Sequence, residues 1–555
     1  MRDKPPRILR IVKWRIRKVS FRLEKDPPEW LNELTPWATS LTVHGLILLA
    51  LGLGVLATSG ETKEQSLVAS LPTDQLVEDI TALEPADQAG DALAKDDMGE
   101  APSLTLDPSQ VDPIKSNLPE LPPDFVLGRE LQLSSGGGEP SAGETPLVTG
   151  AAGPGGFAGM PGAEGPKMAP FSGRSPQMRA RIARQAGGTV MSEQAVTRGL
   201  GWLARHQAGD GHWDLNHRPT CQGSGCPSDK HMNSPTAGTG LALLPFLGAG
   251  RIHNESGDYS KNVKLGLDWL VKNQKPDGDL WTGGDGQTHM YSHAIGAMTL
   301  CEAYGVSKDE ALKPPAQKAI DFIVKAQNKD DGGWRYGPGA PGDTCVFGWQ
   351  LFALRSGALA GLDVPLDTIK LARQYLDKAK GDEFGSTYVY FPGDAGKAAT
   401  PVMSAEGLLC RQYLGWQRNH PPLLVGAQRV YEDLQKGLDF DKDTGALVGL
   451  KNRNIYYWYY ATQLLHNMQG EAWVRWNIQV RDSLVATQNS SNGCAKGSWD
   501  PELVLSDGKR LPDAHGAQAG RLFVTSLSLL TLEVYYRYLP LYQARDRNNL
   551  GGKAK

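Results

Sequence analysis

Two cysteines separated by four residues, Cys221 and Cys226, lie in a long connection between predicted helices. They flank the segment Gln-Gly-Ser-Gly, and His231 follows five residues later. Two thiols this close form a local disulfide in an oxidising compartment or, together with an imidazole, supply three ligands for zinc. The sequence leaves both interpretations open. We expect the other four cysteines to be buried thiols.

Aromatic residues form a second group with chemical potential. They concentrate in the most apolar predicted helices, where five occur in a row from Tyr456 to Tyr460. Such rings stabilise a cation through their quadrupoles, or they pack as ordinary core. Five consecutive rings must point in several directions, so we expect only some to face a central cavity. The predicted cavity residues are Tyr291, Phe347, Trp349, Tyr457, Trp458 and Phe523.

A helical repeat that begins near residue 190 must position these side chains. A Gln followed by Gly and Trp recurs four times, each time at the end of an amphipathic helix. We predict that the Gln amide fastens the Gly-containing turn and that the Trp packs on a neighbour, so these residues are structural. They are Gln207, Trp213, Gln274, Trp281, Gln327, Trp334, Gln488 and Trp499. The Trp spacing predicts two further copies, ending near residues 390 and 445.

Each copy is followed by a second, more apolar helix, which gives six helical hairpins. The alternation of polar-faced and nearly all-apolar helices predicts an outer ring around a buried inner ring. The inner helices begin at capping residues, among them Ser234, Asp343 and Thr400. The fold class is therefore predicted to be all-α, an (α/α)6 toroid of six hairpins.

The segment from Arg198 to Trp213 resembles the QW motif of squalene–hopene and oxidosqualene cyclases, and the later copies match it with insertions. The resemblance covers residues 190–545. It implies the toroid shared by triterpene cyclases and protein prenyltransferase β subunits. Squalene–hopene cyclases use a D-x-D-D-T motif whose middle Asp protonates an alkene. The similar stretch here is Ala340-Pro-Gly-Asp-Thr344, in which Gly342 takes the place of the proton donor. Asp343 and His293 remain as candidate catalytic residues.

The helix after this stretch is similar to the zinc-bearing helix of prenyltransferase β subunits, D-x-C-x-x-x-W-Q. The resemblance implies Asp343 and Cys345 as zinc ligands, with a His on a later inner helix as the third ligand. The next inner helix contains no His, and Glu406 occupies that neighbourhood; His289 and His293 could supply an imidazole from another direction. The alternative is that Asp343 is only a helix cap and Cys345 an ordinary buried residue.

An apolar run without Lys, Arg, Asp or Glu covers residues 37–58. Its 22 residues would span about 33 Å as a helix, enough to cross a bilayer. Ten basic residues precede it, which predicts a cytoplasmic N-terminus and an extracytoplasmic remainder. The predicted segments are a basic cytoplasmic segment (1–36), a transmembrane helix (37–58), a disordered acidic and then Gly/Pro-rich linker (59–188), the toroid (189–545) and a disordered tail (546–555).

The formal net charge is −3, from 58 basic and 61 acidic residues, and it excludes an overall basic surface for nucleic acid. We predict a bacterial single-pass protein of the cytoplasmic membrane with a periplasmic toroid. The toroid is expected to bind an isoprenoid or lipid, or a protein partner, without standard squalene-cyclase chemistry. The alternative is a divergent terpene cyclase or a zinc-dependent prenyltransferase-like enzyme that uses Asp343 and Cys345.

Overall fold

The computed structural model describes residues 171–221, 225–226, 232–392, 398–440, 442, 447–505, 508–538 and 541–542. The predicted basic segment, the apolar run 37–58, most of the linker and the tail lie outside this range. Among the described residues, none of the helices has the length and hydrophobicity needed to cross a membrane.

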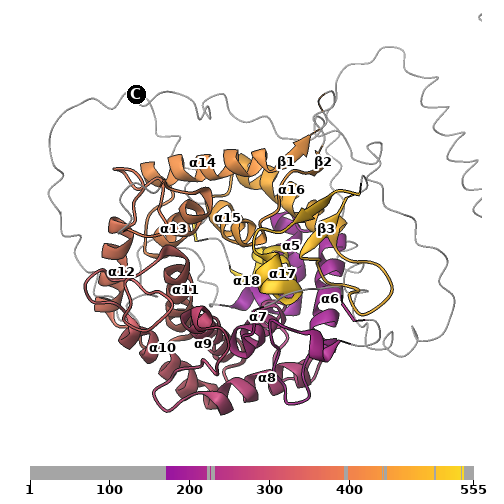
Figure 1. Ribbon diagram of the computed structural model, residues 1–555, viewed down its shortest axis with the longest axis horizontal. Helices are drawn as coiled ribbons and strands as arrows, with labels where there is room; N and C mark the ends of the chain where they lie inside the picture. Colours follow the sequence, from indigo (N-terminus) through magenta and orange to yellow (C-terminus); the bar gives the residue numbers. More distant parts are fainter. Residues whose placement is uncertain are drawn as a thin grey trace, which may run out of the picture. The chain divides into compact units, whose positions relative to one another are not determined.

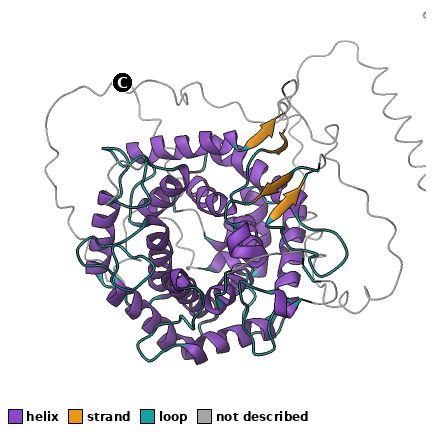
Figure 2. Cartoon of the chain, in the orientation of Figure 1, coloured by secondary structure: helices purple, strands orange, loops and turns teal. Residues whose placement is uncertain are grey.

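Twelve helices of the described part form two concentric rings (Figures 1 and 2). The outer ring consists of α6 (Val190–Arg205), α8 (Ser260–Asn273), α10 (Lys313–Ala326), α12 (Leu366–Lys378), α14 (Pro421–Lys436) and α16 (Glu471–Thr487). The inner ring consists of α7 (Pro235–Gly248), α9 (His289–Ser307), α11 (Thr344–Ala360), α13 (Pro401–Tyr413), α15 (Ile455–Met468) and α17 (Gly516–Leu532). Each inner helix contacts the next, and α17 contacts α7, so the inner ring is closed. The predicted helical toroid of six hairpins is confirmed for these residues.

The elements in the connections between these helices are short. They are the 3-10 turns η4 (Arg218–Thr220), η5 (Gly286–Thr288) and η6 (Glu310–Leu312), and two antiparallel hairpins. Strand β1 (Leu438–Phe440) pairs with β2 (Leu447–Leu450), and β3 (Glu502–Val504) pairs with β4 (Arg510–Pro512).

Burial follows the predicted difference between the two rings. Every residue of α15 is buried, whereas α12 buries one face, which includes Ile369, Ala372 and Leu376. An all-apolar helix must be covered on every side, and the inner position provides this cover. The predicted caps are present, because the side chains of Ser234, Asp343 and Thr400 each accept a backbone N–H at the start of an inner helix.

The repeated Gln residues join neighbouring outer helices. The Gln327 amide donates to the Gly332 carbonyl at 2.9 Å and to the Thr368 carbonyl of α12 at 3.1 Å. Gln207 and Gln274 make the same pair of bonds in their copies. Gln488 donates to the Gly497 carbonyl and to the Ala195 carbonyl of α6, both at 2.8 Å. The last outer helix is therefore fastened to the first by the same device.

Three of the four Trp residues are buried and anchor their own outer helix. The indole N–H groups of Trp213, Trp334 and Trp499 donate to carbonyls of that helix or its last turn, at 2.7–2.8 Å. Trp281 differs from this pattern. It is half-buried and stacks on His289 with ring centroids 4.4 Å apart, while Leu280 is buried.

The reason for this difference is the spacing within the motif. In the other three copies Trp lies two residues after the Gly that ends the turn, but Trp281 lies three residues after Gly278. Leu280 therefore takes the buried position. Tyr388 marks the copy predicted near residue 390: it is fully buried, and its backbone N–H donates to Ser404 Oγ at 3.1 Å. The Trp213 N–H makes an equivalent bond to Thr239.

The C-terminal ends of the inner helices are closed by segments that flank the twelve helices. These are η3 (Ser172–Arg174), α5 (Pro176–Ala186) and α18 (Val534–Arg537). Glu302 of α9 lies 2.8 Å from Arg174 Nη1 and 3.0 Å from Arg537 Nη2, and these side chains are at most 1% exposed. The predicted linker therefore ends earlier than residue 188. Composition alone does not reveal this, because the segment is held by the long-range ion pair of Arg174.

Candidate functional site

Several apolar and aromatic side chains near the starts of the inner helices are partly exposed. Tyr291 of α9, Cys345 of α11 and Val402 of α13 are half-buried in the first turns, and Phe523 is half-buried just after a kink at Gly520 of α17. The Cys345 thiol lies 3.5 Å from the Met403 sulfur, which brings the first turns of α11 and α13 into contact. Solvent therefore reaches apolar and aromatic side chains at this end of the ring.

Deeper in the ring the space is filled by side chains. Trp349 of α11 stacks on Tyr459 of α15, with centroids 5.9 Å apart, and both are buried. Helix α13 separates these two helices in the ring, so the contact crosses the interior. The Arg537 guanidinium in turn donates a hydrogen bond to the Tyr459 hydroxyl at 3.2 Å. This layer forms a packed floor.

A buried acid, Glu406 of α13, lies between the half-buried side chains near the helix starts and the packed floor. The Tyr456 hydroxyl donates to it at 3.2 Å, and a Cβ atom added to Gly348 of α11 would lie 1.9 Å from its carboxyl oxygen. Burial raises the pKa of Glu406 well above its usual value, which favours the uncharged acid. The sequence indicates Glu406 as unusual, because it is the one acidic residue of α13, a helix that is otherwise largely apolar.

Asp343 caps α11 and is fully buried. Its Oδ1 accepts the Val346 N–H at 2.9 Å, and its Oδ2 lies 3.5 Å from the Arg335 guanidinium. Burial raises the pKa of Asp343 to about 6, although Val346 and Arg335 oppose the shift. The aromatic hydroxyls of Tyr336 and Tyr390 are hydrogen-bonded to each other at 2.6 Å close by. The arrangement provides a capping carboxyl that gains a proton more readily than an exposed one.

The residues around Asp343 and Cys345 do not complete a zinc site. Among the described residues, no third His, Cys or carboxylate joins these two in a group with metal-ligand spacing. Burial also raises the pKa of the Cys345 thiol. A zinc ion in a protein takes at least three side-chain ligands. The set predicted from the prenyltransferase resemblance therefore has two members here and does not fit the metal.

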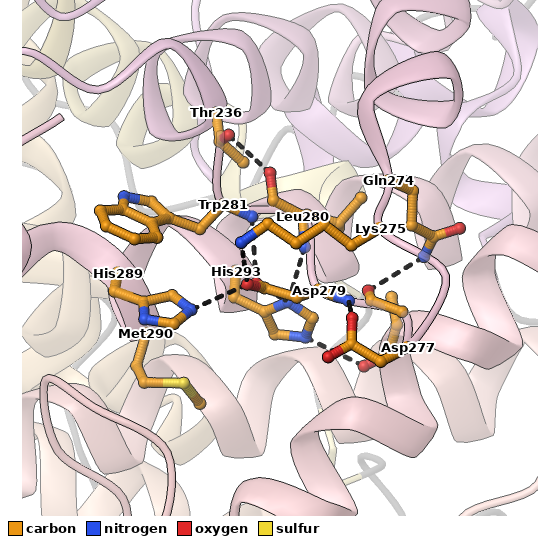
Figure 3. A network of polar contacts seen from close by, with 12 residues as sticks. Thr236, Gln274, Lys275, Asp277, Asp279, Leu280, Trp281, His289, Met290 and His293 are labelled. Carbon is orange, nitrogen blue, oxygen red and sulfur yellow. Dashed lines mark hydrogen bonds and ion pairs between the residues drawn. The ribbon is translucent and has the colours of Figure 1, made fainter. Parts of the chain in front are cut away.

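His293 lies among the residues of the turn that precedes α9 (Figure 3), and it contacts α10 of the outer ring. Its Nδ1 accepts the Leu280 N–H at 3.2 Å, and its Nε2 lies 3.0 Å from the Ala319 carbonyl of α10. His289 lies 3.0 Å from Asp279. Burial acts to raise the pKa of Asp279, but His289, the nearby His293 imidazole and Lys275 hold it well below its usual value. These histidines fasten the start of α9 to the preceding turn.

Most of the aromatic residues predicted to line a cavity have other partners. Phe347 stacks on Tyr375 of α12, the Tyr457 hydroxyl donates to the Val430 carbonyl of α14, and Trp458 packs against Trp476 of α16. The structure thus places these three toward the outer ring. Trp349 belongs to the packed floor, while Tyr291 and Phe523 are half-buried near the starts of α9 and of the part of α17 that follows its kink.

A buried His/Cys cluster elsewhere contains both cysteines of the first connection. His206, Cys221, Cys226 and Cys494 hold their ligand atoms within 4.8 Å of one another. Cys221 and Cys226 are thiols, so the disulfide interpretation differs from the structure. His231 lies outside the described residues. His206 and Cys494 were missed because nothing in the local sequence relates them to this connection.

No family model matches the sequence. Over 236 residues the chain is 27% identical to squalene–hopene cyclase of Bradyrhizobium diazoefficiens; the match covers 38% of this chain and 33% of that protein. The chain therefore spans about a third of the length of the curated relative it matches.

Several solved structures are also similar to this chain at low sequence identity. They include type II terpene cyclase MstE from Scytonema (12% identity, TM-score 0.38, covering 62% of this chain and 98% of that one), an α-amylase from Clostridium perfringens (12%, 0.41, 62% and 97%) and a GH76 α-mannanase of Bacteroides thetaiotaomicron (10%, 0.41, 66% and 99%). The distant sequence similarity to a cyclase agrees with the double ring of helices.

Proposed function

We propose that the double ring binds an apolar ligand of the isoprenoid type at the first turns of its inner helices. The observation that carries the proposal is the set of half-buried apolar and aromatic residues Tyr291, Cys345, Val402 and Phe523, which come from four inner helices. Covering apolar surface is favourable by about 25 cal/mol per Å². A hydrocarbon chain covers these side chains without leaving polar groups unpaired.

The proposal excludes the alkene protonation of squalene–hopene cyclases. Gly342 stands at the position of their proton donor, and a Cβ atom there would lie 2.6 Å from the Tyr375 ring. Its backbone N–H is bonded to Asp331 at 2.7 Å. A carboxylate side chain at this position would have to displace the Tyr375 ring and the Gly333 backbone, which supports binding without that chemistry.

The sequence similarity supports the choice of ligand. The curated relative at 27% identity is named for squalene, an isoprenoid hydrocarbon. In the proposal, residues 37–58 anchor the ring to the cytoplasmic membrane on its outer side, where such a ligand is available from the bilayer. Protease protection of the full chain in spheroplasts tests this placement: cleavage of the ring by external protease is expected, and full protection would refute it.

A second candidate function is acid catalysis on the bound ligand. It is favoured by two carboxyl groups whose pKa values burial has raised, Asp343 to about 6 and Glu406 well above its usual value. A neutral carboxylic acid in an apolar site can donate a proton. Incubation of the full chain with squalene, followed by mass spectrometry, separates the candidates. Unchanged squalene supports binding alone, and a new product that Glu406→Gln abolishes supports catalysis.

The binding experiment uses full-length protein in mild detergent and radiolabelled squalene. Cys345→Trp fills the space at the first turns and is expected to weaken binding at least about tenfold, because one buried ring changes affinity by about 1.4 kcal/mol or more. Phe384→Trp is the matched control, because Phe384 is 55% exposed and lies on another part of the chain. Equal binding by both variants and the parent protein, with unchanged helical content, would refute the proposed site.

A further inference from the structure

The cluster of His206, Cys221, Cys226 and Cys494 joins the two ends of the ring. His206 directly follows α6, and Cys221 and Cys226 lie between η4 and α7. Cys494 lies between α16 and β3, 288 residues from His206. The contact between the first hairpin (α6–α7) and the last hairpin (α16–α17), here called the seam, is the place where the ring closes. The four side chains therefore meet across the seam.

The donor atoms have the spacing of a tetrahedral metal site. His206 Nε2 lies 3.1 Å from Cys494 Sγ and 3.4 Å from Cys226 Sγ. All four donor atoms lie within 4.8 Å of one another. Zinc bonds to sulfur and nitrogen at about 2.3 and 2.05 Å with tetrahedral angles, which places a sulfur and a nitrogen about 3.6 Å apart and two sulfur atoms about 3.8 Å apart. The four atoms need only small displacements to reach these values.

The neighbours of His206 prepare it to act as a ligand. Its Nδ1 lies 2.8 Å from the Trp202 carbonyl, so Nδ1 carries the hydrogen and Nε2 presents its lone pair to the sulfur atoms. The Trp202 ring stacks on the imidazole with centroids 4.2 Å apart. The Cys226 backbone N–H points at Cys221 Sγ, 3.5 Å away, as is favourable for a thiolate. The orientation of the His206 ring and the N–H group directed at the Cys221 sulfur both favour metal binding by these four side chains.

A disulfide explains this cluster poorly. Three sulfur atoms meet, so one disulfide would leave a third thiol against the imidazole. His206 and Cys226 are buried, and Cys221 and Cys494 are half-buried. Three thiolates and one neutral imidazole form a closed set of three sulfur ligands and one nitrogen ligand, which soft divalent metals prefer.

We propose that His206, Cys221, Cys226 and Cys494 bind one structural zinc ion that clasps the seam. Binding displaces the three thiol protons to solvent, and the zinc dication offsets two of the three thiolate charges, which leaves the site with a net charge of −1. All four positions are filled by protein, so the ion has no open position for a substrate. The site is separate from the proposed ligand site, and neither proposal depends on the other.

The main experiment is elemental analysis of the full-length protein purified under reducing conditions with zinc present. One equivalent of zinc is expected in the parent protein and none in Cys494→Ser. Cys345→Ser is the matched control, because Cys345 is also half-buried but lies in the inner ring; it is expected to retain the full equivalent. Zinc absent from the parent, retained by Cys494→Ser or lost from Cys345→Ser would each overturn the proposal.

Two further measurements remain decisive where Cys494→Ser fails to fold. Cys494→His restores a zinc-binding side chain and is expected to regain the equivalent of metal. Cobalt substituted into the parent protein is expected to give the charge-transfer absorption of thiolate ligands, with about three thiols protected from alkylation until the metal is removed. Cobalt binding without thiolate absorption, or a disulfide between any two of the three cysteines in the reduced, metal-supplemented protein, would contradict the zinc clasp.

Discussion

The buried ion pairs of Glu302 predict a large loss of stability when this carboxylate is neutralised. Burial acts to raise the pKa of Glu302, but Arg174 and Arg537 lower it to about 2. Relative to about 4.3 in an unfolded chain, this shift corresponds to about 3 kcal/mol in favour of the folded state. Glu302→Gln also leaves two guanidinium groups buried without their carboxylate. We therefore expect the variant to lose about 3–5 kcal/mol of unfolding free energy at pH 7.

Urea denaturation followed by circular dichroism measures this loss from the shift of the midpoint. Asp268→Asn is the matched control: Asp268 lies 2.6 Å from Lys264, but both side chains are 58% exposed. Its removal should change the unfolding free energy by less than about 1 kcal/mol. The comparison isolates the effect of burial, because the exposed Asp268–Lys264 distance is shorter than either distance from Glu302 to its arginines.

A double-mutant cycle with Arg174→Met tests the cause. Arg174→Met should cost much less in the Glu302→Gln background than in the parent, because the guanidinium has already lost its partner. The pH dependence has a defined sign: a lowered carboxyl pKa gives stability that is present above about pH 4.3 and is lost as the pH falls toward about 2. Additive effects in the cycle, or a loss below about 1 kcal/mol for Glu302→Gln, would refute the reasoning.

Three further predictions concern a turn of the repeat, the seam and the helix-capping residue Asp343. Gly332→Ala should lower the unfolding free energy by more than about 2 kcal/mol in urea denaturation, because φ is +85° and the new Cβ would lie 2.1 Å from the Leu371 carbonyl. Gly361→Ala is the control: φ is +87° but the space is open, so it should cost about 1 kcal/mol. Equal costs for the two variants would contradict the clash at Gly332. Gln488→Ala should cost about 1–3 kcal/mol, because it removes the bonds to Ala195 and Arg198 across the seam and the bond to the Gly497 carbonyl, and an unchanged midpoint would contradict its role. Asp343 has a folded-state pKa of about 6, raised above about 3.9 in the unfolded chain, so its contribution falls by about 3 kcal/mol as the pH rises between these values. Asp343→Asn keeps a capping oxygen and should remove that pH dependence, and a variant with the parent's profile would show that another group titrates.

Much of the ring could be predicted from local sequence, because each hairpin repeats the same short-range chemistry. Gln327, Gly332 and Trp334 lie within eight residues, and their contacts lie within the hairpin or with the next one. One inserted residue was enough to move Trp281 out of the corresponding position, since a turn fixes side-chain direction residue by residue.

The sites depended on contacts that sequence distance conceals. His206 and Cys494 come from opposite ends of the ring, so neither lies near the two cysteines that signalled a metal. His293 has the residue type and helix position of a site residue, but its ring faces the outer helices. Periodicity marks an inner helix that is apolar all round, but it does not say which of its faces turns toward the centre.

The two ends of the described ring meet, because Arg174 Nη2 donates to the Arg537 carbonyl at 3.1 Å. A short peptide could therefore join them, and new termini could be opened at the exposed residues Glu383 and Phe384 between α12 and α13. In such a circular permutant the seam would become an ordinary covalent junction between neighbouring hairpins. The order in which the hairpins emerge during synthesis would change while every contact of the ring was kept, which would show whether closure must come last in folding.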